Sequence, residues 1–246
     1  HSINEGIVKC QREGIQSSIE VIVAGPWFPE AVAMLKEFPD ADVGVHLTLT
    51  SEWDNVKWRP LTEAKSLRDA EGYFFPMLHP NRNYPERALM EQEWKLEEVE
   101  REFRAQIELA KKHIPQVNHL SGHMGCTAFD VRVRELTKRL AQEYGLELEL
   151  APGTLNYVTY SGPKGTAEEK IESIIRMLDR LEGGKTYLFV DHPGLDSSEL
   201  RAIHHIGYEN VAEDRQGVTT AWTSPKVKEA IKDRGIELIG YKDLRK

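Results

Sequence analysis

Segments with the pattern of β-strands alternate with segments with the pattern of helices along nearly the whole chain. The runs at 42–50 and 186–190 are rich in apolar and β-branched residues, as buried strands are. The segment at 90–113 instead carries apolar residues at three- and four-residue steps, which is the period of a helix. This alternation predicts an α/β fold with a parallel sheet covered by helices.

The remaining elements follow from the same two periods and from turn residues. Strands are predicted at 16–25, 42–50, from 117, at 146–150, 186–190 and 236–240. Helices are predicted from Ser2, at 29–37, 90–113, 128–144, 167–181 and 224–234, with a short one capped by Ser197 or Ser198. With about six or seven strands in one chain, a barrel or near-barrel is favoured over an open sheet.

The chain of 246 residues is 40% hydrophobic, which fits one large α/β domain as well as two small ones. We expect a single domain over residues 1–246. A net charge of -8 argues against a nucleic-acid backbone as partner. No apolar run approaches the roughly 20 residues that span a bilayer, so no membrane partner is expected. Cys10 and Cys126 are expected to be free thiols in a reducing compartment.

The chain begins on a helix, since Ser2 or Asn4 can cap one and apolar residues follow at helical spacing. In an α/β chain the first helix normally follows a strand. We therefore expect a first strand upstream of His1 in the gene product. The cytoplasm is the expected compartment. A cleaved signal peptide would also explain a start without Met, so a periplasmic or secreted protein is the alternative.

Residues 51–93, called the excursion below, interrupt the alternation with aromatic residues set among Pro, Asn, Asp and Gly. The segment is too long for a plain connection. We expect a structured excursion over one end of the domain, the barrel mouth. Its aromatic residues either pack on the flank of the fold or form a lid that stacks on sugar-like ligands.

Histidines follow several of the predicted strands. His46 lies inside the run at 42–50, His119 and His123 lie four residues apart after 117, and His192 follows the run at 186–190. In barrels the chemistry lies at the carboxyl ends of the strands. Imidazole suits zinc, iron and nickel, and a hydrolytic metal site needs two or three protein ligands and an open position for water.

His46 and His123 are accordingly the predicted metal ligands, with an Asp or Glu from elsewhere as the third. His119 is a weaker ligand candidate and is predicted to orient its neighbour.

Several segments together resemble one known family. They are Ser-Ile-Asn-Glu-Gly-Ile at 2–7, Val-Gly-Val-His-Leu-Thr at 43–48, Arg-Pro-Leu at 59–61 with 66–73, Asn-His-Leu-Ser-Gly-His-Met-Gly at 118–125, and His-Pro-Gly at 192–194. In this order they resemble the YdjC-like carbohydrate deacetylases, the family that includes chitooligosaccharide deacetylase. The resemblance covers the full chain.

The resemblance implies a distorted (β/α) TIM-like barrel with a divalent metal ion, Mg or Zn, at its mouth. In the family an Asp and two His hold the metal, and His46 and His123 match the two histidines. The Asp belongs to an Asp-Asp pair that would precede His1, and its neighbour is the general base. His192 matches an active-site histidine suited to general-acid or oxyanion duty.

The implied reaction is removal of N-acetyl groups from amino sugars or chitooligosaccharides. Predicted sugar contacts are Trp58, Phe74, Phe75, Tyr84 and Arg215, and a homodimer is a possible assembly. The alternatives are a metal-dependent hydrolase of phosphoesters or cyclic amides, and a carbohydrate-binding protein without activity.

Two positions depart from the family pattern. Ser121 stands where the family often has Asp, which removes a carboxylate that could orient a histidine, so Ser121 is grouped with His119 as a supporting residue. Asp191 before His192 is also unexpected. These departures bear on the range of substrates more than on the type of reaction.

Overall fold

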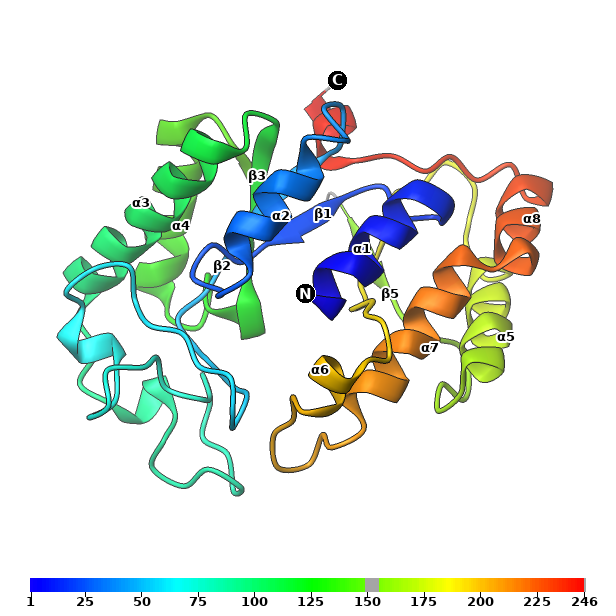
Figure 1. Cartoon of the computed structure of the whole chain (residues 1–246). Helices are drawn as coiled ribbons and strands as arrows, with labels where there is room; N and C mark the ends of the chain where they lie inside the picture. The colour runs from blue at the N-terminus through cyan, green and yellow to red at the C-terminus, as the bar shows by residue number, and fades with distance from the viewer. Residues whose placement is uncertain (149–154, 246) are drawn as a thin grey trace. The chain divides into compact units, whose positions relative to one another are not determined.

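The structure of the chain, a computed structural model, describes residues 1–148 and 155–245. These residues form eight α-helices and two sheets, and every strand pairing within the sheets is parallel (Figure 1). The predicted α/β class is confirmed. The chain divides into two compact units, one built on each sheet. The closed barrel and the single domain stay predictions.

The first unit, called the four-stranded unit, comprises residues 18–148, 204–209 and 240–245 of the described chain. Its sheet has the strand order β1-β2-β3-β4. The strands are β1 (Ile19–Val21), β2 (Val43–Leu47), β3 (Val117–Gly122) and β4 (Glu147–Leu148). The helices are α2 (Phe28–Leu35), α3 (Leu96–His113) and α4 (Val131–Tyr144). Residues 149 and 150 of the predicted strand at 146–150 lie outside the described residues.

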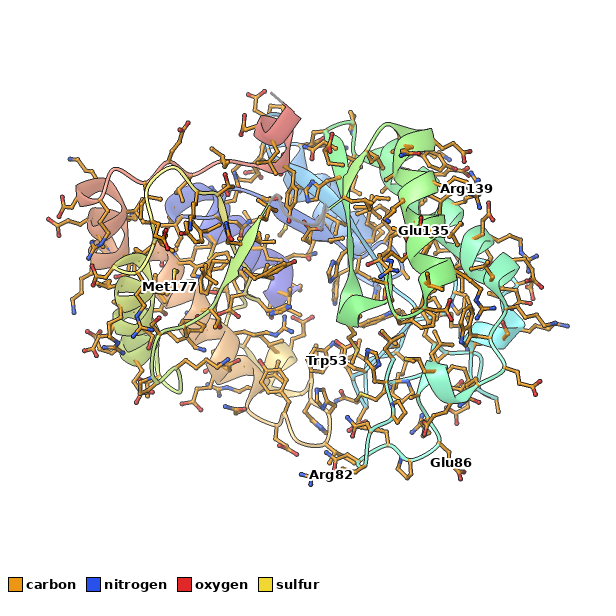
Figure 2. The ribbon with its side chains drawn as sticks, turned by 180° about the vertical axis from the view of Figure 1, so that it is seen from behind. Trp53, Arg82, Glu86, Glu135, Arg139 and Met177 are labelled. Carbon is orange, nitrogen blue, oxygen red and sulfur yellow. The ribbon has the colours of Figure 1, made fainter. Side chains whose placement is uncertain are left out.

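The apolar core of this unit lies between β2 and α3. Val45 and Leu47 are fully buried on β2, and Phe103 and Ile107 are fully buried on α3. Helix α4 lies beside α3, and two salt bridges join them, Arg139–Glu100 at 2.9 Å and Arg104–Glu143 at 2.7 Å. Figure 2 labels Glu135 and Arg139 on α4. The sheet is therefore covered by helices, as the alternation predicts.

Helix α3 begins at Leu96, six residues later than predicted. The residues before it are used by the excursion, because Leu89 N donates to Met77 O at 2.8 Å and Met90 N donates to Leu78 O at 3.1 Å. Lys95 N donates to Ser66 Oγ at 3.0 Å. These backbone N–H groups are bonded to the excursion, and the helix starts after them.

The excursion holds two short 3₁₀ helices, η1 (Lys65–Leu67) and η2 (Leu89–Glu91), and is tied to α3 by buried carboxylates. Glu102 accepts from Leu61 N and Thr62 N at 3.0 Å each, and Glu98 accepts from Ser66 N at 2.7 Å. Figure 2 shows Arg82 and Glu86 at the lower end of the excursion and Trp53 above them. The excursion is thus structured, as expected for so long a segment.

The second unit, called the two-stranded unit, comprises residues 1–17, 155–203 and 210–239 of the described chain. Its parallel strands are β5 (Asn156–Val158) and β6 (Tyr187–Phe189). Its helices are α1 (Ser2–Glu13), α5 (Ala167–Leu178), α6 (Ser198–Arg201), α7 (Val211–Thr223) and α8 (Pro225–Asp233). Buried residues of four of these helices form its core, among them Cys10, Ile174, Trp222 and Val227.

Two elements of this unit were not predicted, strand β5 and helix α7. Helix α7 contains Gly217 and Thr219, residues with low helix propensity, so local preference gives little sign of it. Packing stabilises the helix instead, because Val218 and Trp222 are buried in the core. A Cβ added at Gly217 would lie 3.0 Å from Lys170 Cε, which shows how closely α5 approaches.

The predicted strand at 236–240 is wrong. Ile236 N donates to Ile231 O at 3.1 Å, so the chain is still closing the end of α8 at that residue. The segment from Gly240 is held by side chains, since Gly240 N donates to Asp243 Oδ2 at 3.0 Å. A 3₁₀ helix, η4 (Tyr241–Arg245), follows.

Both cysteines are free and buried, which agrees with the expected free thiols. Burial raises the pKa of the Cys10 thiol to about 12. Over residues 1–148 and 155–245, none of the helices combines the length and the apolar character that crossing a membrane requires.

Candidate active site

A row of polar residues crosses three strands of the four-stranded unit. Glu20 on β1 is aligned with Gly44 on β2, and Gly44 is aligned with His119 on β3. Two residues further along, His46 on β2 is aligned with Ser121 on β3. Because side chains alternate between the faces of a sheet, all of these lie on one face, opposite the apolar face of β2.

Gly44 is what allows Glu20 and His119 to meet across β2. A Cβ at this position would lie 2.3 Å from His119 Nε2 and 2.5 Å from Glu20 Oε2. Without it, Glu20 Oε1 and His119 Nε2 are 2.5 Å apart. Glu20 was not predicted as a site residue, although a carboxylate inside the apolar run Ile-Glu-Val-Ile-Val at 19–23 is a signal, since a buried charge needs a partner.

His119 is fully buried and both of its ring nitrogens face acceptors. Nε2 faces Glu20, and Nδ1 lies 2.6 Å from Asn118 Oδ1. The amide orientation follows from its other end, because Asn118 Nδ2 donates to Asp42 Oδ1 at 2.8 Å. The ring also stacks on Tyr241, with 4.0 Å between centroids. Each ring nitrogen of His119 is therefore directed at a side-chain oxygen of the protein.

Asp42 joins the beginning of β2 to the end of the chain. Its carboxylate accepts from Tyr241 N and Lys242 N, each at 2.9 Å. Burial alone would raise the pKa of Asp42, but the backbone donors of Lys242 and Tyr241 outweigh it and hold this pKa below its usual value. Asp42 is therefore an anion that fixes both Asn118 and the C-terminal segment.

His46 is held through the hydroxyl of Ser121. His46 Nδ1 lies 2.6 Å from Ser121 Oγ, and the same hydroxyl donates to Glu20 Oε2. Burial would raise the pKa of Glu20, but His119, His46 and the Ser121 hydroxyl outweigh it and keep this pKa below its usual value. The three side chains thus form a continuous path from an anionic carboxylate to His46.

His123 lies directly after β3, at the start of the 3₁₀ helix η3 (His123–Gly125). The chain turns sharply there, with positive φ at Met124 (52°) and Gly125 (78°). His123 Nε2 lies 2.9 Å from Glu52 Oε2, a buried carboxylate at the start of the excursion. The His46 and His123 rings are 5.5 Å apart between centroids and inclined at 72°.

The two rings fit a shared metal ion. Imidazoles bound to one tetrahedral zinc ion have centroids roughly 5 Å apart, given Zn–N distances of about 2.0–2.1 Å. The ligand set is incomplete within the described part of the chain, where no group of three or more His, Cys, Asp or Glu side chains could hold a metal ion. His46 and His123 therefore fit as two ligands of a site that needs at least one more.

His192 belongs to the two-stranded unit and follows β6. Its neighbour Asp191 accepts from the backbone N–H of His192 at 2.8 Å and from the Tyr160 hydroxyl at 2.5 Å. Burial would raise the pKa of Asp191, but the hydrogen bonds from His192 and Tyr160 keep it below its usual value. The His192 ring is 61% exposed and lies 3.7 Å from Asp191. It is available to a ligand from solvent.

The predicted sugar contacts differ in exposure. Phe74 is fully buried, and Trp58 and Tyr84 are nearly so. The polar atoms of Trp58 and Tyr84 are bonded within the protein, since Trp58 Nε1 donates to Thr50 O and Tyr84 Oη donates to Asp54 Oδ1. Phe75 is half-buried. These environments are those of packing residues for Phe74, Trp58 and Tyr84, while the sugar-binding role stays a prediction.

Arg215, the fifth predicted sugar contact, lies on α7 in the two-stranded unit and is half-buried. Its backbone carbonyl accepts from Gly194 N at 3.2 Å. A Cβ added at Gly194 would lie 3.1 Å from Arg215 Cβ. Arg215 thus packs against the segment that carries His192.

Comparison with known proteins gives a consistent picture. The model of the YdjC-like protein family matches residues 1–233. A protein of Thermus thermophilus named carbohydrate deacetylase is 43% identical over 187 residues, which is 66% of this chain and 65% of that protein. One of Enterococcus faecalis with the same name is 26% identical over 259 residues, covering 99% of this chain and 93% of that protein.

A crystal structure from Enterococcus faecalis V583 shares the fold. It is described as that of a candidate cellobiose-phosphate cleavage protein, and its TM-score with this chain is 0.76. The two sequences are 24% identical, and the superposition covers 99% of this chain and 93% of that one. The likeness extends over the elements of both units.

Proposed function

We propose that this chain, which belongs to the YdjC-like protein family, is a metal-dependent carbohydrate deacetylase that removes N-acetyl groups from amino sugars or chitooligosaccharides. The observation that carries the proposal is the pairing of His46 and His123, two imidazoles at the carboxyl ends of neighbouring parallel strands. Relatives along almost the full chain are named carbohydrate deacetylases, which supports the same reaction class. A distorted barrel is the proposed arrangement of the strands.

The proposed metal is Zn²⁺ or Mg²⁺, and two imidazole ligands favour zinc. When bound, such an ion polarises the acetyl carbonyl oxygen and lowers the pKa of a water molecule toward neutrality. His46 and His123 would hold it, and the family resemblance assigns the third ligand and the general base to aspartates before His1.

The two histidines differ in how the protein orients them. A carboxylate only accepts hydrogen bonds, so Glu52 accepts from His123 Nε2–H, which leaves the lone pair of the neutral ring on Nδ1. His46 is oriented through its Nδ1 by Ser121. Each ring is fixed by one nitrogen, as metal-binding histidines commonly are.

His192 is the proposed general acid that protonates the leaving amine nitrogen of the sugar. Its exposed ring suits this role, because the donor must reach a substrate atom. Asp191 beside it is an anion, 3.7 Å from the ring. Among the predicted aromatic contacts, Phe75 is half-buried, while Phe74, Trp58 and Tyr84 are buried, so Phe75 is the proposed stacking residue.

The test is acetate release by the full-length natural protein from N-acetylglucosamine oligomers, with a phosphomonoester and a cyclic amide in parallel. We expect acetate from the oligomers alone, and His46→Ala and His123→Ala to lower the rate at least about 100-fold, as loss of a metal ligand does. His79→Ala removes an exposed histidine of the excursion and should keep the rate. Turnover of only the phosphomonoester or the cyclic amide would contradict the proposal.

A further inference from the structure

The hydrogen bonds among Glu20, Ser121 and His46 fix which nitrogen of His46 carries its proton. Glu20 accepts on both oxygens, from His119 Nε2 on Oε1 and from the Ser121 hydroxyl on Oε2. Ser121 has one proton, and it goes to Glu20. Ser121 Oγ must then accept from His46 Nδ1–H, 2.6 Å away. The lone pair of neutral His46 is thereby placed on Nε2.

Several contacts fix the position of the Glu20 carboxylate. His119 holds Oε1 at 2.5 Å and is in turn held by Asn118 and stacked on Tyr241. The gap at Gly44 lets the Glu20 carboxylate lie against β2, 4.0 Å from His46 Nδ1. The carboxylate is too far from His46 for a direct hydrogen bond, and the Ser121 hydroxyl bridges the two.

We infer that Glu20 is a positioning residue for the metal site, acting through the Ser121 hydroxyl to set the tautomer and orientation of His46. The inference rests on the proposed function, because it takes His46 to be a metal ligand. The role is divided between a hydroxyl on β3 and a carboxylate on β1. Removing such a supporting partner typically costs about 10–100-fold in metal affinity.

The experiment measures Zn²⁺ affinity of the full-length natural protein by competition with a chromophoric chelator. It also records the ¹⁵N shifts of His46 in the metal-free protein. Glu20→Gln replaces an acceptor by a donor, so the Ser121 proton is free to turn toward His46 Nδ1. We expect a 10–100-fold loss of Zn²⁺ affinity, and a shift of the His46 proton from Nδ1 to Nε2.

Two further variants separate positioning from folding. Ser121→Ala breaks the path but leaves the pair of Glu20 and His119, and it should lose Zn²⁺ affinity to the same extent. Ser121→Asp in the Glu20→Gln background supplies a carboxylate next to His46 and should restore the affinity. Ser18→Ala is the matched control, because Ser18 Oγ contacts His119 Nε2 at 3.4 Å and is not on the path to His46.

Wild-type Zn²⁺ affinity together with the wild-type tautomer in folded Glu20→Gln and Ser121→Ala would overturn the inference. If these two variants keep the affinity and His46→Ala loses it, the inference fails while the proposed metal site stands. Wild-type affinity in His46→Ala would overturn both. If Glu20→Gln does not fold, Ser121→Ala and its comparison with Ser18→Ala decide the question.

Discussion

The two units hold their candidate catalytic histidines in different ways. In the four-stranded unit, His46 and His123 each have a ring nitrogen fixed by a side chain, Ser121 and Glu52 respectively. In the two-stranded unit, the His192 ring is 61% exposed, and the hydrogen bond to Asp191 comes from its backbone N–H. The first arrangement is rigid and the second leaves the ring accessible.

The difference corresponds to two chemical roles. A metal ligand has to present one lone pair at a fixed place, so its other nitrogen is occupied by a partner. A general acid has to reach a substrate atom and exchange its proton with solvent, so an exposed ring beside an anion suits it. The predictions below test the rigid arrangement first and the accessible one last.

Gly44→Ala should have the largest effect on the four-stranded unit. The new Cβ would overlap His119 and Glu20, the pair on which the polar row depends. We expect the free energy of unfolding to fall by about 3 kcal/mol, as overpacking a core can cost, and Zn²⁺ affinity to fall as well. Urea unfolding followed by circular dichroism measures the first effect. Gly183→Ala, whose Cβ meets nothing within 4 Å, should leave both unaltered.

Asp42→Asn should cost about 2 kcal/mol, because an acceptor of three N–H groups is replaced by a side chain that is partly a donor. The pKa of Asp42 is lower in the folded state than in the unfolded state. The carboxylate therefore stabilises the fold fully at pH values above its unfolded-state pKa of about 3.9. This stabilisation is lost as the pH falls through the lower folded-state pKa. The difference between wild type and variant should be constant near neutral pH and shrink in acid. A difference that grows as the pH falls would contradict this account.

Tyr160→Phe should have the smallest effect, about 1 kcal/mol on the stability of the two-stranded unit. It removes one hydroxyl that donates to Asp191 and keeps the donor from His192 N. The Asp191 pKa should rise toward its ordinary value. We expect kcat for acetate release to fall by less than about 10-fold with KM unchanged. A fall as large as that of His192→Ala would mean that Tyr160 itself touches the substrate.

The fold could be predicted where an element carries its own periodicity. Helix α5 and strand β2 lie within two or three residues of their predicted limits. Helix α7 could not be predicted, because Gly217 and Thr219 have low helix propensity and the helix is stabilised by packing. The segment 236–240 has a strand-like composition but closes the end of α8 instead.

The site could be predicted in part, because histidines next to strand ends stand out in the sequence. The structure brings the rings of His46 and His123 together. This proximity could not be deduced from the spacing of the two residues in the sequence. Glu20 and Gly44 were missed, since their importance depends on the register of β1, β2 and β3, which are far apart in the sequence. Glu52 was missed because an acidic residue in an irregular segment usually lies in solvent.

The most direct test of the central claim is the metal dependence of acetate release by the full-length natural protein. The account predicts that a chelator abolishes release from N-acetylglucosamine oligomers and that Zn²⁺ or Mg²⁺ restores it. It also predicts that neither ion restores activity to His46→Ala or His123→Ala, while His79→Ala responds as the wild type does. Acetate release that persists after complete metal removal, or that survives in both histidine variants, would contradict the account.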